Sequence, residues 1–300
     1  MDRPHRNALL LLHFTVLIWG LTGIFGRLIQ LPADQLVYIR TLIGMAGLAM
    51  AAPIMRFPLR PGADLRHQLL TGVIIAGHWL SFYGAIKLAT VSVAVACLAA
   101  STIFTALLEP LWTKRGIRGY EVVLGVAVIA ALFLIFGLET KHRLGIAVAT
   151  LSALLAAWFT VINGQLIKRD HAGRIGFFEL GGATLVLGIW LAIDGRLPMP
   201  LWRLPSTDIL YLSLLGLLCT SFAFVAGIAV MRQLSAFTVS LTVNLEPVYS
   251  ILLALLIWGE DERLHWGSYV GFALILAALF INGWLQQRAR TPRRTRLVRG

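Results

Sequence analysis

Long apolar stretches separated by short polar segments dominate the chain. Each stretch is about 20 residues long, which is the length of a helix that crosses a bilayer, and each is bounded by charged residues or proline. The stretches lie near 8 to 29, 36 to 55, 67 to 87, 90 to 112, 120 to 138, 144 to 167, 174 to 194, 208 to 231, 235 to 257 and 264 to 285. This pattern predicts an all-α integral membrane protein with ten transmembrane helices.

The composition agrees with this prediction. Hydrophobic residues make up 58% of the chain and charged residues only 13%, whereas soluble domains carry roughly 25% charged residues. Ten spans leave only short loops in 300 residues, so we expect no separate soluble domain. Cys97 and Cys219 lie in apolar stretches without a Cys-x-x-Cys or Cys/His pattern, which indicates small core residues. We therefore expect no metal and no other cofactor.

The formal net charge of +12 has a topological explanation. If the N-terminus is cytoplasmic, most of the 26 lysines and arginines fall in cytoplasmic segments, as the positive-inside rule requires. The pattern predicts that both termini are cytoplasmic and that the chain is a multi-pass protein of the inner membrane, of bacterial origin. Residues 286 to 300 form a basic cytoplasmic tail, which either sets the topology or contacts anionic lipid headgroups. No basic stripe interleaved with aromatics occurs outside the spans, so no nucleic-acid partner is expected.

The chain also matches itself at an offset of about 140 residues. Trp19 aligns with Trp158 and Arg40 with Glu179, and the segment from Thr90 aligns with the segment from Ser235. The match divides the chain into a first five-helix repeat, 7 to 138, and a second, 143 to 285. Because five is odd, the second repeat starts on the opposite side of the membrane and is inverted. Inverted repeats are typical of secondary transporters, which move a solute by alternating access around a midplane site.

Several short motifs resemble a known family. They are Trp19-Gly20 in the first span, Arg40-Thr-Leu in the second, and Asn-Leu-Glu-Pro at 244 to 247 running to Trp-Gly-Glu at 258 to 260. Together with the repeat, they are similar to EamA-type permeases of the drug/metabolite transporter superfamily, over residues 8 to 285. The resemblance implies a secondary transporter, often an exporter of metabolites or amino acids. One departure is that Ser101-Thr102 stands where the second half has Glu246-Pro247, so the halves are not expected to contribute equally to the site.

Ionisable side chains inside spans are the first candidates for function, because burying them in hydrocarbon is costly. Glu246 lies midway along the ninth span and His78 midway along the third. Glu246 either binds a cationic group, carries a proton, or is a neutral acid hydrogen-bonded between helices. Pro247 cannot donate to the carbonyl of Val243, so we expect a kink there. His78 either exchanges protons or is held by a neighbouring helix.

Aromatic and polar residues at similar depth complete the candidate site. Trp19, Trp158, Trp79, Tyr83 and Tyr249 either line an aromatic pocket for the substrate or serve as packing. Ser101, Thr102 and Asn244 either contact the substrate or hydrogen-bond between helices.

Two further charged residues lie nearer the membrane surfaces. Arg40 near the outer side either closes a gate, attracts a carboxylate, or extends its head to the interface. Glu179 near the inner side is a gating or proton-coupling candidate, and its alternative, shared with Glu109, is pairing with Lys114, Arg115 or Arg174.

These features favour a secondary transporter over other classes. We expect it to move a small metabolite or amino-acid-like solute, in the export direction, with proton coupling as an option. The alternatives are an intramembrane enzyme and a channel or lipid scramblase. Protease and hydrolase motifs and Walker-type loops are absent from the sequence, so no enzyme is expected. The expected partners are a small-molecule substrate, the lipid bilayer and, as an open option, a second copy in a homodimer.

Overall fold

The computed structural model describes residues 3–89, 94, 97–136, 143–197, 203–249, 253 and 266–290, and every regular element in these ranges is a helix. The first half contains α1 (Arg3–Leu28), α2 (Ala33–Met55), α3 (Leu65–Leu88), α5 (Ala100–Thr113) and α6 (Gly119–Phe136). The second half contains α7 (Arg143–Leu166), α8 (Ala172–Ile193), α9 (Ser206–Leu214), the π-helix η2 (Leu215–Phe222), α10 (Ala223–Val230), α11 (Ala236–Val243) and α13 (Trp266–Arg290).

Seven helices in the described ranges are long and apolar enough to cross a membrane. They are α1, α2, α3, α7, α8, α13 and the continuous rod Ser206–Val230 made of α9, η2 and α10. Helix α6 is apolar but shorter. The predicted spans 90 to 112, 120 to 138, 235 to 257 and 264 to 285 each include residues outside the described ranges, as do the 258 to 260 motif and the tail beyond 290. The all-α membrane prediction is confirmed.

Large apolar side chains on the outside of the bundle fit a hydrocarbon environment. Ile54, Ile193 and Phe280 expose 84%, 81% and 76% of their surface. Soluble monomers rarely expose extended apolar patches, whereas lipid-facing helix surfaces consist of them.

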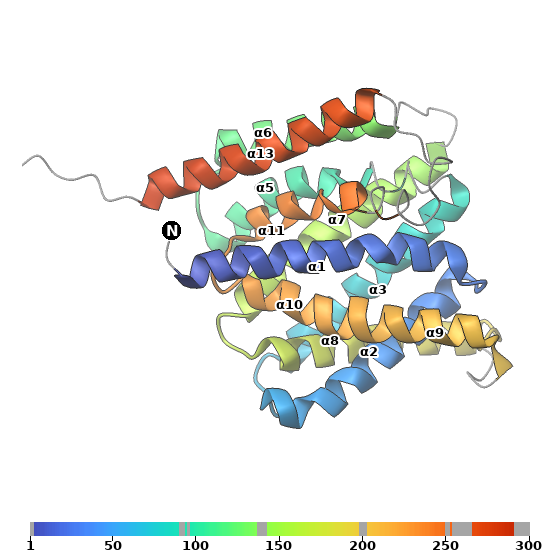
Figure 1. The fold of residues 1–300 in the computed structure, drawn as a ribbon. Coiled ribbons are helices and arrows are strands. Elements are labelled where there is room, and N and C mark those ends of the chain that lie inside the picture. The colour runs from blue at the N-terminus through green and yellow to red at the C-terminus, as the bar shows by residue number, and fades with distance from the viewer. Residues whose placement is uncertain are drawn as a thin grey trace, which may run out of the picture.

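Helices from the two halves pack against each other throughout the bundle. Helix α3 lies against α7 and α8, α2 against α8 and η2, and α6 against α13 at the edge of the molecule (Figure 1). Helix α3 approaches α8 closely: a Cβ added at Gly72 would lie 2.1 Å from the carbonyl oxygen of Glu179. Glycine at this position lets the two backbones touch.

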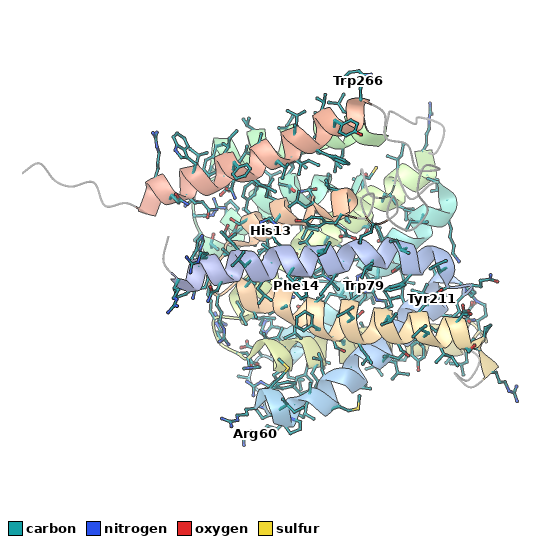
Figure 2. The ribbon with its side chains drawn as sticks, viewed as in Figure 1. His13, Phe14, Arg60, Trp79, Tyr211 and Trp266 are labelled. Carbon is teal, nitrogen blue, oxygen red and sulfur yellow. The ribbon has the colours of Figure 1, made fainter. Side chains whose placement is uncertain are left out.

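Helix α1 begins and α13 ends at the same end of the bundle, which we call the basic end (Figure 1). Arg60 lies towards this end, and Trp266 lies at the far end of α13 (Figure 2). Several hydrogen bonds join the first half to the second here, and two of them involve carboxylates. Glu109 accepts a bond from the Phe237 N–H at 3.1 Å, and the Gln68 amide donates to Asp170 at 2.7 Å.

Candidate functional site

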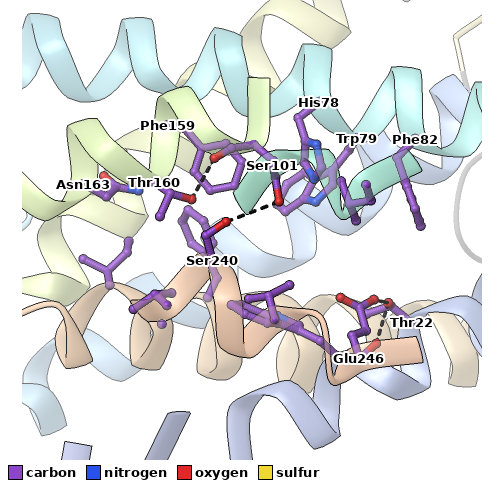
Figure 3. A pocket seen from close by; sticks show the side chains of 18 of the residues that line it. Thr22, His78, Trp79, Phe82, Ser101, Phe159, Thr160, Asn163, Ser240 and Glu246 are labelled. Atoms are coloured by element: carbon purple, nitrogen blue, oxygen red, sulfur yellow. Dashed lines mark hydrogen bonds between the residues drawn. The ribbon is translucent and has the colours of Figure 1, made fainter. Parts of the chain in front are cut away.

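A cavity lies in the centre of the bundle, between helices of both halves (Figure 3). Its volume is about 120 Å³, well above the roughly 10–15 Å³ that one water molecule needs. Aromatic rings form much of its wall, namely Trp19, Trp79, Phe82, Tyr83, Phe159 and Phe224. Polar and charged side chains interrupt this wall, namely Thr22, Arg40, His78, Ser101, Thr160, Asn163, Ser240 and Glu246. An apolar wall with a few polar groups is typical of a small-molecule site.

Arg40 of α2 is the cation of the cavity. Its side chain is buried, with only 3% of the residue exposed, so it does not extend to the membrane surface. The guanidinium donates to the Thr220 hydroxyl at 2.9 and 3.1 Å and to the Tyr83 hydroxyl at 3.1 Å. It also lies 4.2 Å from the ring centroid of Trp79, in cation–π geometry.

The π-helix η2 positions Thr220 for this contact. The Thr220 hydroxyl donates to the carbonyl of Leu215, five residues earlier, and accepts from Arg40. The same segment leaves the Cys219 carbonyl available to the indole N–H of Trp19 at 3.1 Å. Segments of π-helix occur often at functional sites.

Glu246 of the second half is the carboxylate of the cavity. Helix α11 ends at Val243, and Asn244 and Leu245 bond to carbonyls only three residues earlier. Helical structure resumes at Glu246, so the kink that Pro247 predicts is confirmed. The Thr22 hydroxyl lies 3.3 Å from Glu246 Oε1 (Figure 3).

Arg40 and Glu246 face the same cavity without forming an ion pair. Within the described ranges, no carboxylate lies within salt-bridge distance of Arg40, and no basic group lies within that distance of Glu246. Buried charges in proteins are normally paired. The cavity therefore presents one guanidinium and one carboxyl group to a bound molecule.

His78 lines the cavity from α3 and is anchored to α7. Its Nδ1 lies 3.0 Å from the carbonyl and 2.9 Å from the hydroxyl of Ser152, and the ring packs on Phe159 and Phe82. The Nδ1–H tautomer satisfies these contacts, which are those expected of a histidine held by a neighbouring helix.

The remaining polar candidates form a ladder between α5 and α11. Ser101 lies 3.3 Å from Ser240 and reaches the cavity. Thr102 accepts a 2.7 Å bond from the Asn244 amide, and both are buried beside the cavity rather than lining it. Their contacts are those of interhelical hydrogen bonding.

Besides Thr102 and Asn244, three predicted residues lie outside the cavity wall. Trp158 points outward, with 39% of its surface exposed and its ring edge-on to Trp112, because a repeat match fixes depth but not the face of the helix. The Tyr249 hydroxyl lies 3.5 Å from Nδ1 of His13. Glu179 lies behind the wall, where the amide of Asn163 donates to it at 3.2 Å.

Of the ion pairs predicted for Glu109 and Glu179, the structure contains one and lacks another. Glu109 pairs with Arg115 at 3.2 Å, as one alternative predicts. Arg174 instead pairs with Asp170 at 2.7 Å, so it is not the partner of Glu179.

The sequence reasoning missed Thr22, Thr220, Asn163 and Phe159. Asn163 carried a usable signal, since an amide in the middle of an apolar span is costly unless bonded. Thr220 carried none, because its role depends on the π-helix. No cluster of three or more histidine, cysteine, aspartate or glutamate side chains suited to a metal occurs in the part of the chain that the structure describes.

A family model covers nearly all of this architecture. The model of the EamA-like transporter family matches the chain twice, over residues 6–137 and 143–284. The chain belongs to the EamA-like transporter family. It is therefore a multi-pass membrane transporter, as the resemblance predicted.

Individual relatives agree with this assignment. The chain is 22% identical over 282 residues to a probable biotin transporter of Pseudomonas aeruginosa, covering 90% of this chain and 95% of the relative. It is also 22% identical to uncharacterized transporters of Clostridium kluyveri, covering 74% of this chain and 73% of the relative, and of Bacillus subtilis, covering 93% and 90%. A chain of known crystal structure superposes with a TM-score of 0.78 at 17% identity, covering 95% of this chain and 99% of the other. This last likeness concerns the fold alone.

Proposed function

We propose that this chain is a secondary transporter for a small solute that carries both a carboxylate and an amine, such as an amino-acid-like metabolite. The observation that carries the proposal is the pair of opposite charges, Arg40 and Glu246, on one central cavity without an ion pair between them. A carboxylate bound at Arg40 and an ammonium bound at Glu246 would compensate both charges. The aromatic wall suits an apolar or planar remainder of the solute.

The bundle is proposed to consist of ten spans arranged as two inverted five-helix repeats. The two separate matches of one family model support the division at about residue 140. So do the contacts of equivalent helices, since α2 packs on α8, α5 on α11 and α6 on α13. Such pairing is expected around a pseudo-two-fold axis, and rocking of one half against the other gives alternating access.

The basic end is proposed to face the cytoplasm of a bacterial cell, with export as the direction of transport. Both described chain ends and Arg60 lie there, which fits the positive-inside rule. The bond from the Gln68 amide to Asp170, which joins the halves at this end, is suited to an inner gate.

A ligand-binding screen tests the site. The purified protein is melted in the presence of the twenty amino acids, of their decarboxylated amines and of biotin, a solute with a carboxylate but no amine. A ligand at 100 times its Kd adds about 2.7 kcal/mol of stability. We expect stabilisation by at least one amino acid, and we expect it to be lost in Glu246→Gln.

Glu109→Gln is the matched control, because it removes a buried carboxylate outside the cavity. It keeps the ligand effect if the site is assigned correctly. A ligand that stabilises Glu246→Gln as strongly as the parent would show that the cavity carboxylate does not bind it.

A further inference from the structure

A second buried carboxyl group lies just behind the cavity wall. Glu179 of α8 is completely buried, and at this point α8 touches α3 backbone to backbone, next to Gly72. The amide nitrogen of Asn163, a residue of α7 that lines the cavity, donates to Glu179 Oε2 at 3.2 Å. Asn163 thus lies between this carboxyl group and the cavity.

Two oxygen atoms of this pair lack a donor. Glu179 Oε1 and Asn163 Oδ1 are both fully buried and have no hydrogen-bond partner within the described ranges. A buried acceptor without a donor costs about 1–3 kcal/mol, and more if the group is charged. An ionised Glu179 would therefore be poorly compensated by one amide.

No charged group compensates Glu179 from the described helices that pack on it. On its own helix, Arg174 is bound to Asp170. From α2, Arg40 is held by Thr220 and Tyr83, and from α3, His78 is held by Ser152. Helix α7 presents the neutral Asn163, and α10 contacts α8 through the apolar Val225, near Gly176.

A single proton supplies what both atoms lack. When it binds Glu179 Oε1, the carboxylate becomes a carboxylic acid whose O–H can donate to Asn163 Oδ1, while Oε2 goes on accepting from the amide. An acid and a primary amide then share two hydrogen bonds. When the proton leaves, Glu179 can no longer donate to Asn163 Oδ1, and the bond from the Asn163 amide changes as well. Because Asn163 lines the cavity, the loss of the proton alters the cavity wall.

We propose that Glu179 and Asn163 form a proton-binding site, separate from the Arg40–Glu246 solute site and linked to it through Asn163. The role of this proton in driving transport rests on the proposed function. Glu246 then serves the solute and Glu179 the proton.

Infrared spectroscopy of the full chain in vesicles of ether-linked lipids, which lack ester carbonyl groups, tests the site without any solute. A protonated carboxylic acid absorbs in a carbonyl region free of other protein bands, and the band shifts in heavy water. We expect the parent at neutral pH to show such a band that is lost in Glu179→Gln and retained in Glu109→Gln. Glutamine preserves the shape and both hydrogen bonds to Asn163, so this variant should fold.

Asn163→Ala provides a second readout with Glu179 intact. Removing the amide donor should shift the band to higher wavenumber. The proposal is overturned if Glu179→Gln leaves every carbonyl band in place or if Asn163→Ala does not shift the band. It is also overturned if the band appears only after sodium is removed from the buffer, because the site would then bind sodium rather than a proton. Because no solute is present, these outcomes are independent of the binding screen, and a failed screen would refute only the solute proposal.

Discussion

Arg40 is the residue on which the proposed solute site depends. A guanidinium in the interior is normally matched by a carboxylate, but here two hydroxyl groups and an indole face hold it. These neutral partners orient the side chain and leave its charge uncompensated. A bound carboxylate can therefore gain the full charge-assisted interaction.

The first prediction concerns Thr220, which holds the Arg40 side chain by two bonds. Thr220→Val keeps the shape but removes the acceptor. Hydrogen bonds to charged groups contribute about 1.5–3 kcal/mol, so the Kd of the best amino-acid ligand should rise about ten- to hundred-fold in calorimetric titrations. The control is Thr41→Val, a buried threonine of α2 whose hydroxyl, in the part of the chain that the structure describes, bonds only to the Tyr38 carbonyl of its own helix. Equal weakening by both variants would contradict the role of Thr220.

The second prediction concerns pH and His171, which caps the N-terminus of α8. Its Nδ1 accepts the Gly173 N–H at 3.1 Å, which requires a neutral ring. Partial burial lowers the pKa of His171 below its ordinary 6.5; Arg232 and Arg174 lower it further, and Asp170 opposes them. Because the folded-state pKa is lowered, the cap is complete above about pH 6.5 and its contribution is lost as the pH falls through the folded-state pKa.

His171→Asn separates this effect from other titrations, because asparagine caps helices without titrating in this range. Between about pH 7 and pH 5, the melting temperature of the parent should fall more than that of His171→Asn. Parallel curves would mean that the histidine cap does not titrate.

For single residues, the sequence predicted the position along a membrane span but not the direction in which the side chain points. Depth follows from position along a span, so Trp19, His78 and Glu246 could be placed together in advance. The face of a helix depends on packing, which is why Trp158 points to the outside although it aligns with Trp19. The position of Arg40 in the cavity wall depends on Thr220 and Tyr83, which lie 180 and 43 residues away in the chain.

At the scale of elements, two irregular segments build the site. The break before Glu246 follows from Pro247 and was predictable from the sequence. The π-helix was not, because its apolar sequence differs little from that of an α-helix. The contact of α3 with α8 was predictable only in part. Glycine predicts that another helix approaches closely, but it does not predict which helix.

The third prediction tests that contact. Gly72→Ala would force its Cβ into the Glu179 backbone, and overpacking of this kind costs about 1–3 kcal/mol. Gly84→Ala, on the same helix, meets no atom within 4 Å and should be neutral or slightly stabilising. Melting temperatures of the two purified variants make the comparison. If both melt like the parent, α3 and α8 do not touch at Gly72.

For the whole molecule, the repeat was the most informative feature of the sequence. It divided the chain into residues 7 to 138 and 143 to 285, and the family model matches residues 6–137 and 143–284 separately. Helix boundaries were predictable from hydropathy. The shape of the central cavity was not, because it is made of side chains from helices far apart in the chain.

The fourth prediction concerns orientation. Ile117 and Leu197 lie at opposite ends of the bundle and have similar exposures of 59% and 61%. In a background lacking Cys97 and Cys219, Leu197→Cys in intact cells should react with a membrane-impermeant maleimide. Ile117→Cys should react only after permeabilisation. The reverse pattern would place the basic end outside.

Solute counterflow in reconstituted vesicles tests the central claim most directly. Vesicles loaded with the amino acid found in the binding screen are diluted into a trace of the labelled compound. We expect transient accumulation of label by the parent and by Glu109→Gln, and none by Arg40→Gln or Glu246→Gln. Accumulation by the two cavity variants at the parent's rate, or none by the parent above empty vesicles, would contradict the account.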